Sequence, residues 1–344
     1  MTRSRKSIAI LVLVVLAMSQ TFAGAGNRAG TNGASELLIP VGTRDIGMGG
    51  STIATTSGVE ALFWNPAGTA VMKSSADLYI SHMSYFADIG VNYGAIAANI
   101  EGLGVLSLSL KSLAIDAIPV TTTRDPEGTG QTYKPQFFTV GLTYARQLSE
   151  RVAVGLTGNL ISERLGDVSA SGFAFDVGVL YDNLASIHGL SIGVVVKNIG
   201  PQMKYDGTAL LTTATVADLH RPASLYQIQA ASFELPSAIH FGVAYKHQLS
   251  DEMTLLGSTA FQSSNFSDDE YKLGLELSYQ DLLYVRSGYS FAQREEDSRE
   301  FPFGPTVGFG VHSALGSTDI SIDYAYRSMK TFEGNHIFSV KLGF

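Results

Sequence analysis

The feature that most constrains this chain is a two-residue alternation of apolar with small or polar side chains, repeated from Asp77 to the C-terminus. Successive side chains of a β-strand point to opposite faces, so this pattern predicts strands with one apolar face and one small or polar face. In one segment the apolar row is Tyr271, Leu273, Leu275, Leu277 and Tyr279, alternating with Lys272, Gly274, Glu276 and Ser278. Tyrosine at both ends of such a row is typical of a strand that crosses a bilayer between two aromatic girdles.

The composition favours strands in a membrane over helices. Hydrophobic residues make up 45% of the 344 residues and charged residues 16%, whereas soluble domains carry about 25% charged residues. After residue 25 no apolar run approaches the ~20 residues of a spanning helix. The expected fold is all-β: a transmembrane antiparallel β-barrel of about fourteen strands with an N-terminal hatch or plug segment. We predict strands near 77–87, 90–101, 103–115, 136–148, 152–164, 172–183, 190–200, 235–249, 252–264, 270–280, 282–292, 304–314, 318–329 and 335–344.

The connections between these strands alternate in length. Barrels of this class have short periplasmic turns and longer external loops. Tight turns are expected at 101–102, 149–151, 250–251 and 280–281, and long external loops at 116–135, 201–234 and 293–303. The loop 293–303 is rich in charge, and we interpret it as a solvated loop tip. The final strand has Phe338, Val340, Leu342 and Phe344 on one face, and we predict that it pairs with the first strand and closes the barrel.

The first 25 residues have the features of a Sec signal peptide. Arg3, Arg5 and Lys6 precede a short apolar stretch, and small residues up to Ala25 provide a cleavage site. A permanent helical anchor is the alternative, but the apolar stretch is too short for one. The chain has no cysteine, which excludes disulfides, thiolate metal sites and a lipoprotein anchor. We expect export to the outer membrane, with outer-membrane lipid around the barrel.

Residues 26–76 do not alternate, and we assign them to a hatch inside or below the barrel of residues 77–344. Glycines in this segment allow tight backbone packing in a confined space. A phosphate-binding loop is the alternative for the run 47–50, but no Lys-Ser/Thr pair follows it. The residues assigned to the hatch are Gly47, Gly49, Gly50, Trp64, Asn65, Pro66, Ala67 and Gly68.

Two runs of this segment carry a family resemblance. The run 42–51, Gly-Thr-Arg-Asp-Ile-Gly-Met-Gly-Gly-Ser, and the run 63–68, Phe-Trp-Asn-Pro-Ala-Gly, resemble the N-terminal hatch of FadL-like outer-membrane transporters. More narrowly, the chain is similar to the PorV/PorQ family associated with the type IX secretion system. The start at residues 36–42 and the short overall length favour this second family. The resemblance implies a plugged fourteen-stranded barrel.

We predict no catalytic residues, metal site or cofactor. The seven histidines are scattered without metal-ligand spacing, and no G-x-S-x-G nucleophile motif is present. The net charge of −8 gives no support to a nucleic-acid partner. The lumen is the expected location of charges within the strands, because a charge facing lipid costs about 2–4 kcal/mol at the bilayer midplane. These charges are Lys111, Glu163, Arg164, Asp176, Arg286 and Arg327.

The loop 201–234 is unusually apolar for a surface loop. It packs over the barrel mouth on its own side chains, or it presents a surface for a hydrophobic ligand or a protein partner. The residues chosen for such a surface are Met203, Tyr205, Leu219, Leu225, Tyr226 and Phe233. The favoured function is secretion or surface attachment, with external loops binding substrate or partner proteins. A FadL-like transporter of fatty acids or other hydrophobic small molecules is the alternative, and a general porin ranks lowest.

Overall fold

The alternating segments close into one antiparallel barrel. A computed structural model describes residues 28, 30–215, 222–292 and 301–344. Among these residues fourteen strands form the barrel, each paired with its neighbours, and β1 pairs with β21 to close it. The strands are β1 (Ala76–Ser84), β2 (Gly90–Ile100), β3 (Gly104–Ala114), β6 (Gln136–Gln147), β7 (Val152–Leu165), β8 (Val168–Tyr181), β9 (Leu190–Ile199), β15 (Ala238–Gln248), β16 (Met253–Ser264), β17 (Glu270–Tyr279), β18 (Leu283–Ala292), β19 (Phe303–Leu315), β20 (Thr318–Met329) and β21 (Asn335–Gly343).

The predicted all-β barrel fold is confirmed, and most strand ends lie within two residues of prediction. The largest difference is β8, which begins at Val168 rather than at 172. Strands β7 and β8 continue past the predicted end as a ladder that reaches the pair Leu165 and Val168. The tight turn between them contains Gly166 at φ +61°, a left-handed conformation that glycine adopts without strain. A tight turn therefore replaces the longer connection expected there.

Most barrel strands alternate exposed with buried residues. On β17 the outward Leu273 and Leu275 are 46% and 56% exposed, whereas the inward Lys272 and Glu276 are 8% and 6% exposed. The exposed apolar rows form the surface expected to contact lipid. The structure corrects one prediction: Arg164 is exposed, whereas its neighbour Glu163 is buried. Adjacent residues of a strand point to opposite faces, so the two could not both point inward.

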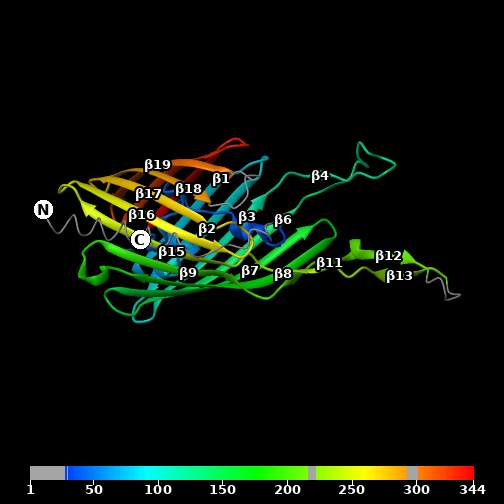
Figure 1. Cartoon of the computed structure of the whole chain (residues 1–344), viewed down its shortest axis with the longest axis horizontal. Helices are drawn as coiled ribbons and strands as arrows, with labels where there is room; N and C mark the ends of the chain where they lie inside the picture. Colours follow the sequence, from blue (N-terminus) through cyan, green and yellow to red (C-terminus); the bar gives the residue numbers. More distant parts are fainter. Residues whose placement is uncertain (1–27, 29, 216–221, 293–300) are drawn as a thin grey trace.

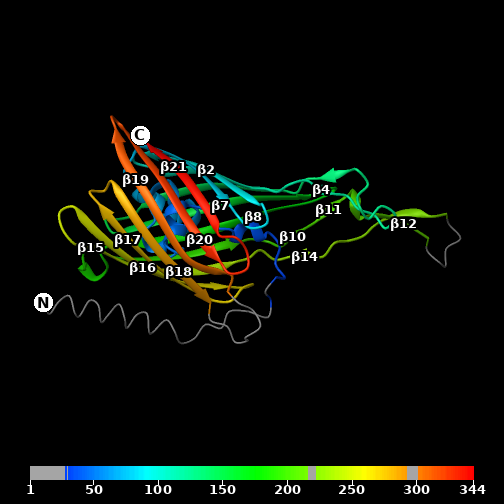
Figure 2. The same ribbon diagram turned by 90° about the horizontal axis from the view of Figure 1, so that it is seen from above.

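Two long connections project from the same end of the barrel (Figures 1 and 2). The connection between β3 and β6 contains a short two-stranded hairpin. The connection between β9 and β15 first pairs with the start of β8 and then forms a longer hairpin. Leu219, the signal peptide and most of the loop 293–303 lie outside the described residues. The elements of these connections are β4 (Ile118–Pro119), β5 (Thr132–Tyr133), β10 (Met203–Lys204), β11 (Asp206–Gly207), η7 (Thr208–Leu210), β12 (Leu211–Ala214), β13 (Ser224–Gln227) and β14 (Ser232–Phe233).

The segment before β1 folds into short helices that pack against the inner faces of the strands (Figure 2). None of the described helices has the length and hydropathy needed to cross a bilayer. The helices of this segment are η2 (Ser35–Leu38), α2 (Thr43–Gly47), η3 (Thr52–Ala54), η4 (Gly58–Glu60), α3 (Ala61–Trp64) and η5 (Pro66–Val71), and η6 (Leu184–Ser186) lies between β8 and β9. Residues 33–72 of this segment constitute the hatch.

Candidate functional site: the hatch and the barrel mouth

Glycines of the hatch lie directly against glycines of the barrel wall. A Cβ added to Gly47 would lie 3.3 Å from the Cα of Gly308, and a Cβ added to Gly288 would lie 2.2 Å from the amide nitrogen of Gly49. The Thr306 hydroxyl donates to the Gly47 carbonyl at 2.9 Å. Inward positions of the strands are left without side chains where the hatch backbone touches the wall, so hatch and wall pack backbone to backbone.

The Asn65–Gly68 element fits the wall at β7 and β8. Asn65 Oδ1 accepts from the Ala67 amide at 3.1 Å, which caps η5. Its Nδ2 donates to the Ile53 carbonyl at 2.8 Å and to the Val179 carbonyl of β8 at 3.3 Å. One side chain therefore caps a helix, ties two parts of the hatch together and attaches the hatch to the barrel. Pro66 follows it and lies against wall glycines at 155 and 178.

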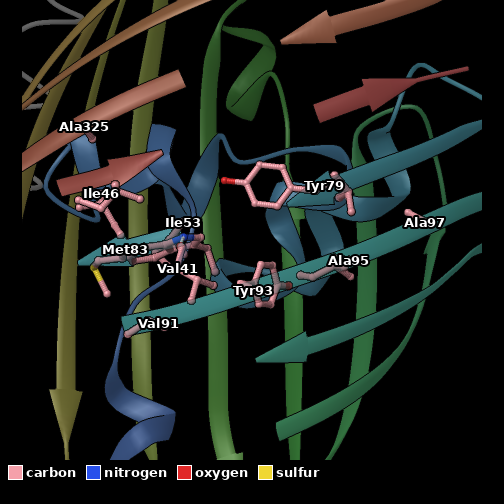
Figure 3. Packing of buried hydrophobic residues seen from close by; sticks show 14 of the residues in the cluster. Val41, Ile46, Ile53, Tyr79, Met83, Val91, Tyr93, Ala95, Ala97 and Ala325 are labelled. Atoms are coloured by element: carbon pink, nitrogen blue, oxygen red, sulfur yellow. Dashed lines mark hydrogen bonds between the residues drawn. The ribbon is translucent and has the colours of Figure 1, made fainter. Parts of the chain in front are cut away.

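Apolar side chains fill the space between the hatch and β1 and β2. Val41, Ile46 and Ile53 of the hatch face Tyr79 and Tyr93 of these strands in one buried cluster (Figure 3). The Thr43 amide donates to the Tyr79 hydroxyl at 3.1 Å, so the one polar atom of that ring has a partner. Trp64 also belongs to the cluster, and its Nε1 donates to the Val41 carbonyl at 2.8 Å; its ring lies against Gly50.

A buried chain of charges joins α2 to strands β17, β18 and β20. Arg44 makes a two-point ion pair with Glu276, at 2.8 and 2.9 Å. Glu276 also accepts from Arg286 at 2.6 Å, and Arg286 in turn pairs with Asp323. Burial alone would lower the pKa of Arg44, but the Glu276 carboxylate holds that pKa above its usual range. Removing one partner of such a buried charge pair strongly destabilises the folded protein, because the other charge is left buried without compensation.

Two further cations of the barrel bind carbonyl oxygens of the hatch. Lys111 Nζ donates to the Glu36 carbonyl at 2.6 Å and to the Ile39 carbonyl at 3.2 Å. Lys197 Nζ donates to the Phe63 carbonyl at 2.6 Å. The sequence predicts that Lys111 faces the lumen, where it is buried, whereas Lys197 is not among the charges chosen from the sequence. The sequence pattern does not tell which hatch atom each one meets.

The apolar loop residues chosen from the sequence separate into two groups. Met203, Tyr205 and Phe233 lie together at the mouth against Leu37 of the hatch, and Met203 is 2% exposed. Tyr205 donates a short hydrogen bond from its hydroxyl to Glu163. The second group consists of Leu225 and Tyr226, which are 65% and 42% exposed on β13. The first group packs against the hatch at the mouth, and the second faces solvent.

Together, the hatch packed against the wall and the apolar cluster at the mouth make this a plugged barrel with projecting hairpins. A family model of the type IX secretion system protein PorV matches residues 22–216, more than half of the chain. The chain belongs to the PorV family. Its matched part includes the whole hatch, the first seven barrel strands and β12. No curated protein matches the chain in sequence.

Solved structures similar to this PorV-family chain are FadL-like outer-membrane barrels. The CymD monoaromatic hydrocarbon channel aligns with a TM-score of 0.56 at 15% identity, covering 89% of this chain and 98% of that one. The toluene transporter TodX of Pseudomonas putida aligns with 0.55 at 11%, covering 88% and 98%. A FadL homologue of Pseudomonas aeruginosa aligns with 0.51 at 12%, also covering 88% and 98%. At these identities the likeness concerns the fold: an outer-membrane barrel with an N-terminal hatch.

Proposed function

We propose that this PorV-family barrel acts in protein secretion or surface attachment by binding substrate or partner proteins with its external hairpins. The observation that carries the proposal is the hairpin β12–β13. Every residue of both strands is exposed, and its apolar residues include Leu211, Leu225 and Tyr226 at 40%, 65% and 42% exposure. Ile228, just beyond β13, is 56% exposed. Exposed apolar groups clustered on one element are typical of a protein-binding surface.

The stability of an isolated hairpin supports the same conclusion. Two strands without a third strand or a packed face are marginally stable in water. The hairpin β12–β13 pairs over four residues, from Leu211 opposite Gln227 to Ala214 opposite Ser224. A partner that covers the apolar side chains or adds a strand to the open edge would stabilise it. Because the hatch occupies the lumen, the barrel itself is better suited to presenting this surface than to conducting a protein.

The test is recovery of partners from native membranes with a tagged barrel. The wild type should recover type IX secretion components or exported surface proteins. The triple variant Leu211→Ser, Leu225→Ser and Ile228→Ser should lose them. Phe332→Ser, in the exposed β20–β21 loop, is the matched control and should recover the same proteins as the wild type. Recovery of the barrel alone from wild-type membranes, or equal recovery with the triple variant, would contradict the proposal.

The alternative function is transport of fatty acids or other hydrophobic small molecules, as the names of the hydrocarbon channel and the toluene transporter suggest for those proteins. The cavity between the hatch and strands β2 to β9 has a volume of about 30 Å³. An engineered cavity that holds benzene is about 150 Å³, so transport requires the hatch to move. Uptake of a labelled long-chain fatty acid in a reporter strain, with and without residues 27–72, tests this alternative; unchanged uptake would exclude it.

A further inference from the structure

A small polar cavity lies between the hatch and the barrel wall. Its volume is about 30 Å³. The hatch contributes apolar side chains to its lining, including the ring of Phe63, and the wall contributes polar ones from five strands. The buried polar residues of the lining are Lys111, Thr139, Asn159, Asp176, Lys197 and Asn198, each at most 9% exposed. A buried cavity with this many polar groups needs an occupant that satisfies them.

Several hydrogen-bond donors around this cavity have no partner among the described residues. An ammonium group has three N–H donors. Lys111 uses two of them on hatch carbonyls and Lys197 uses one, so three remain without an acceptor among the described residues. The Thr139 hydroxyl, 8% exposed, also has no partner there. Each oxygen of Asp176 accepts one hydrogen bond, from the Asn198 amide at 2.6 Å and from Asn159 Nδ2 at 2.9 Å, and neither accepts from an ammonium group in the part of the chain that the structure describes.

Cationic side chains outnumber carboxylates in the lining, two to one. Two ammonium groups lie against the same Phe63 ring, with Nζ to centroid distances of 4.9 Å for Lys111 and 3.6 Å for Lys197. Asp176 is the one carboxylate in the lining. Outside the lining, the Glu163 carboxylate accepts a hydrogen bond from Tyr205, and burial raises the pKa of Glu36 to about 8, so that group is mostly neutral at pH 7.

We propose that this cavity is a binding site for one small monovalent anion of halide size, held between the ammonium groups of Lys111 and Lys197. An anion accepts from several donors at once and removes the cost of a buried, uncompensated cation. The volume limits the ligand, since a single water needs about 10–15 Å³. A halide fits such a space, whereas phosphate, or a fatty acid with its chain, exceeds it.

The bound anion would fasten the hatch to the wall. Lys111 is on β3 and Lys197 is on β9, and both donate to carbonyls of the hatch. An anion between them lets both remain charged and hold those carbonyls. The inference concerns the plug itself and does not depend on partner binding, so it can fail or hold independently of the proposed function.

The direct test is crystallography with bromide as the probe. The detergent-purified full-length barrel is crystallised from chloride-free gluconate buffer with sodium bromide, and data are collected at the bromine absorption edge. We expect one anomalous peak in the cavity within hydrogen-bond distance of both Nζ atoms. Ordinary water density there without an anomalous signal, at a bromide concentration that labels surface sites, would overturn the proposal.

A second test uses thermal unfolding in detergent at constant ionic strength. Replacing gluconate with bromide should raise the midpoint of the wild type by a few degrees and reach a plateau, because a ligand of the folded state stabilises by mass action. Lys197→Met should lose this rise. Lys204→Met, an exposed lysine on β10, is the matched control and should keep it. An equal rise in both variants would mean that halide acts elsewhere and would overturn the assignment.

Discussion

Glu36 is a carboxyl group held away from water at the barrel mouth. It is 4% exposed, and its Oε1 has no hydrogen-bond partner among the described residues. Burial first, and then the neighbouring Glu163, raise the pKa of Glu36 from 4.5 to about 8. A carboxyl group whose pKa is higher in the folded state favours folding when protonated. Its contribution to stability is therefore complete below about pH 4.5 and is lost as the pH rises through 8.

The substitution Glu36→Gln imitates the protonated form and should remove much of this pH dependence. We expect the unfolding midpoint of the wild type in detergent to fall between pH 6 and pH 9, and that of the variant to fall less. At pH 9 the variant should be more stable by about 1–2 kcal/mol. Some dependence should remain, since burial also raises the pKa of Asp45 to about 7. Glu252→Gln, in an exposed turn, is the control; an unaltered slope in Glu36→Gln would refute the prediction.

Adding one methyl group at Gly288 tests the backbone contact between the hatch and the wall. A Cβ there would lie 2.2 Å from the Gly49 amide nitrogen, so Gly288→Ala should displace the hatch and cost about 1–3 kcal/mol. Gly94→Ala adds the same methyl group on β2 where nothing lies within 4 Å, and its effect should stay within about 0.5 kcal/mol. Urea unfolding and protease cleavage of the hatch measure both. Equal stability of the two variants would argue against a tightly seated hatch.

Among the elements, the strands were predictable and the contacts of the hatch were not. The two-residue alternation marks each strand and its outward face, as on β17, because lipid and lumen impose opposite requirements on successive residues. The pair formed by Arg44 and Glu276 joins residues 232 positions apart. An alternating pattern shows that Glu276 faces inward but carries no information about which hatch residue it meets. The hatch was assigned because residues 26–76 do not alternate and are rich in glycine, and the family resemblance of two of its runs supported that assignment.

Strand β17 offers a depth-dependent test of the lipid-facing surface. Leu275 lies in the middle of its outward row and Tyr279 at its end, with exposures of 56% and 41%. Leu275→Arg should cost about 2–4 kcal/mol, whereas Tyr279→Arg, near the bilayer interface, should cost about 0–1 kcal/mol. Reversible urea unfolding in phospholipid vesicles measures both values. Equal costs for the two substitutions would place the membrane elsewhere on the barrel.

At the scale of the whole molecule, the chain passes through the barrel from the loop-bearing end to the opposite end. Arg28 pairs with Glu234 at 2.8 Å, and the Gly33 amide donates to the Glu234 carbonyl, so the start of the described chain lies beside the loop after β14. At the other end of the hatch, the Ser75 amide donates to the carbonyl of Phe344, where β1 begins and β21 ends. The hatch was expected inside or below the barrel, and its helices contact the barrel strands.

This path predicts that Thr31, near the start of the described chain, is accessible from the loop-bearing end of the barrel. If the long loops are external, as in other barrels of this class, Thr31 faces the outside of the cell. The chain has no cysteine, so single-cysteine variants can be labelled without background. A membrane-impermeant maleimide on intact cells should label Thr31→Cys, which is exposed near the mouth, and Leu225→Cys on the projecting hairpin. Asp251→Cys, in an exposed turn at the opposite end, should react after the outer membrane is permeabilised. Labelling of Asp251→Cys but not Thr31→Cys on intact cells would reverse the orientation, and protection of Thr31→Cys alone would mean that the hatch enters from the periplasmic side.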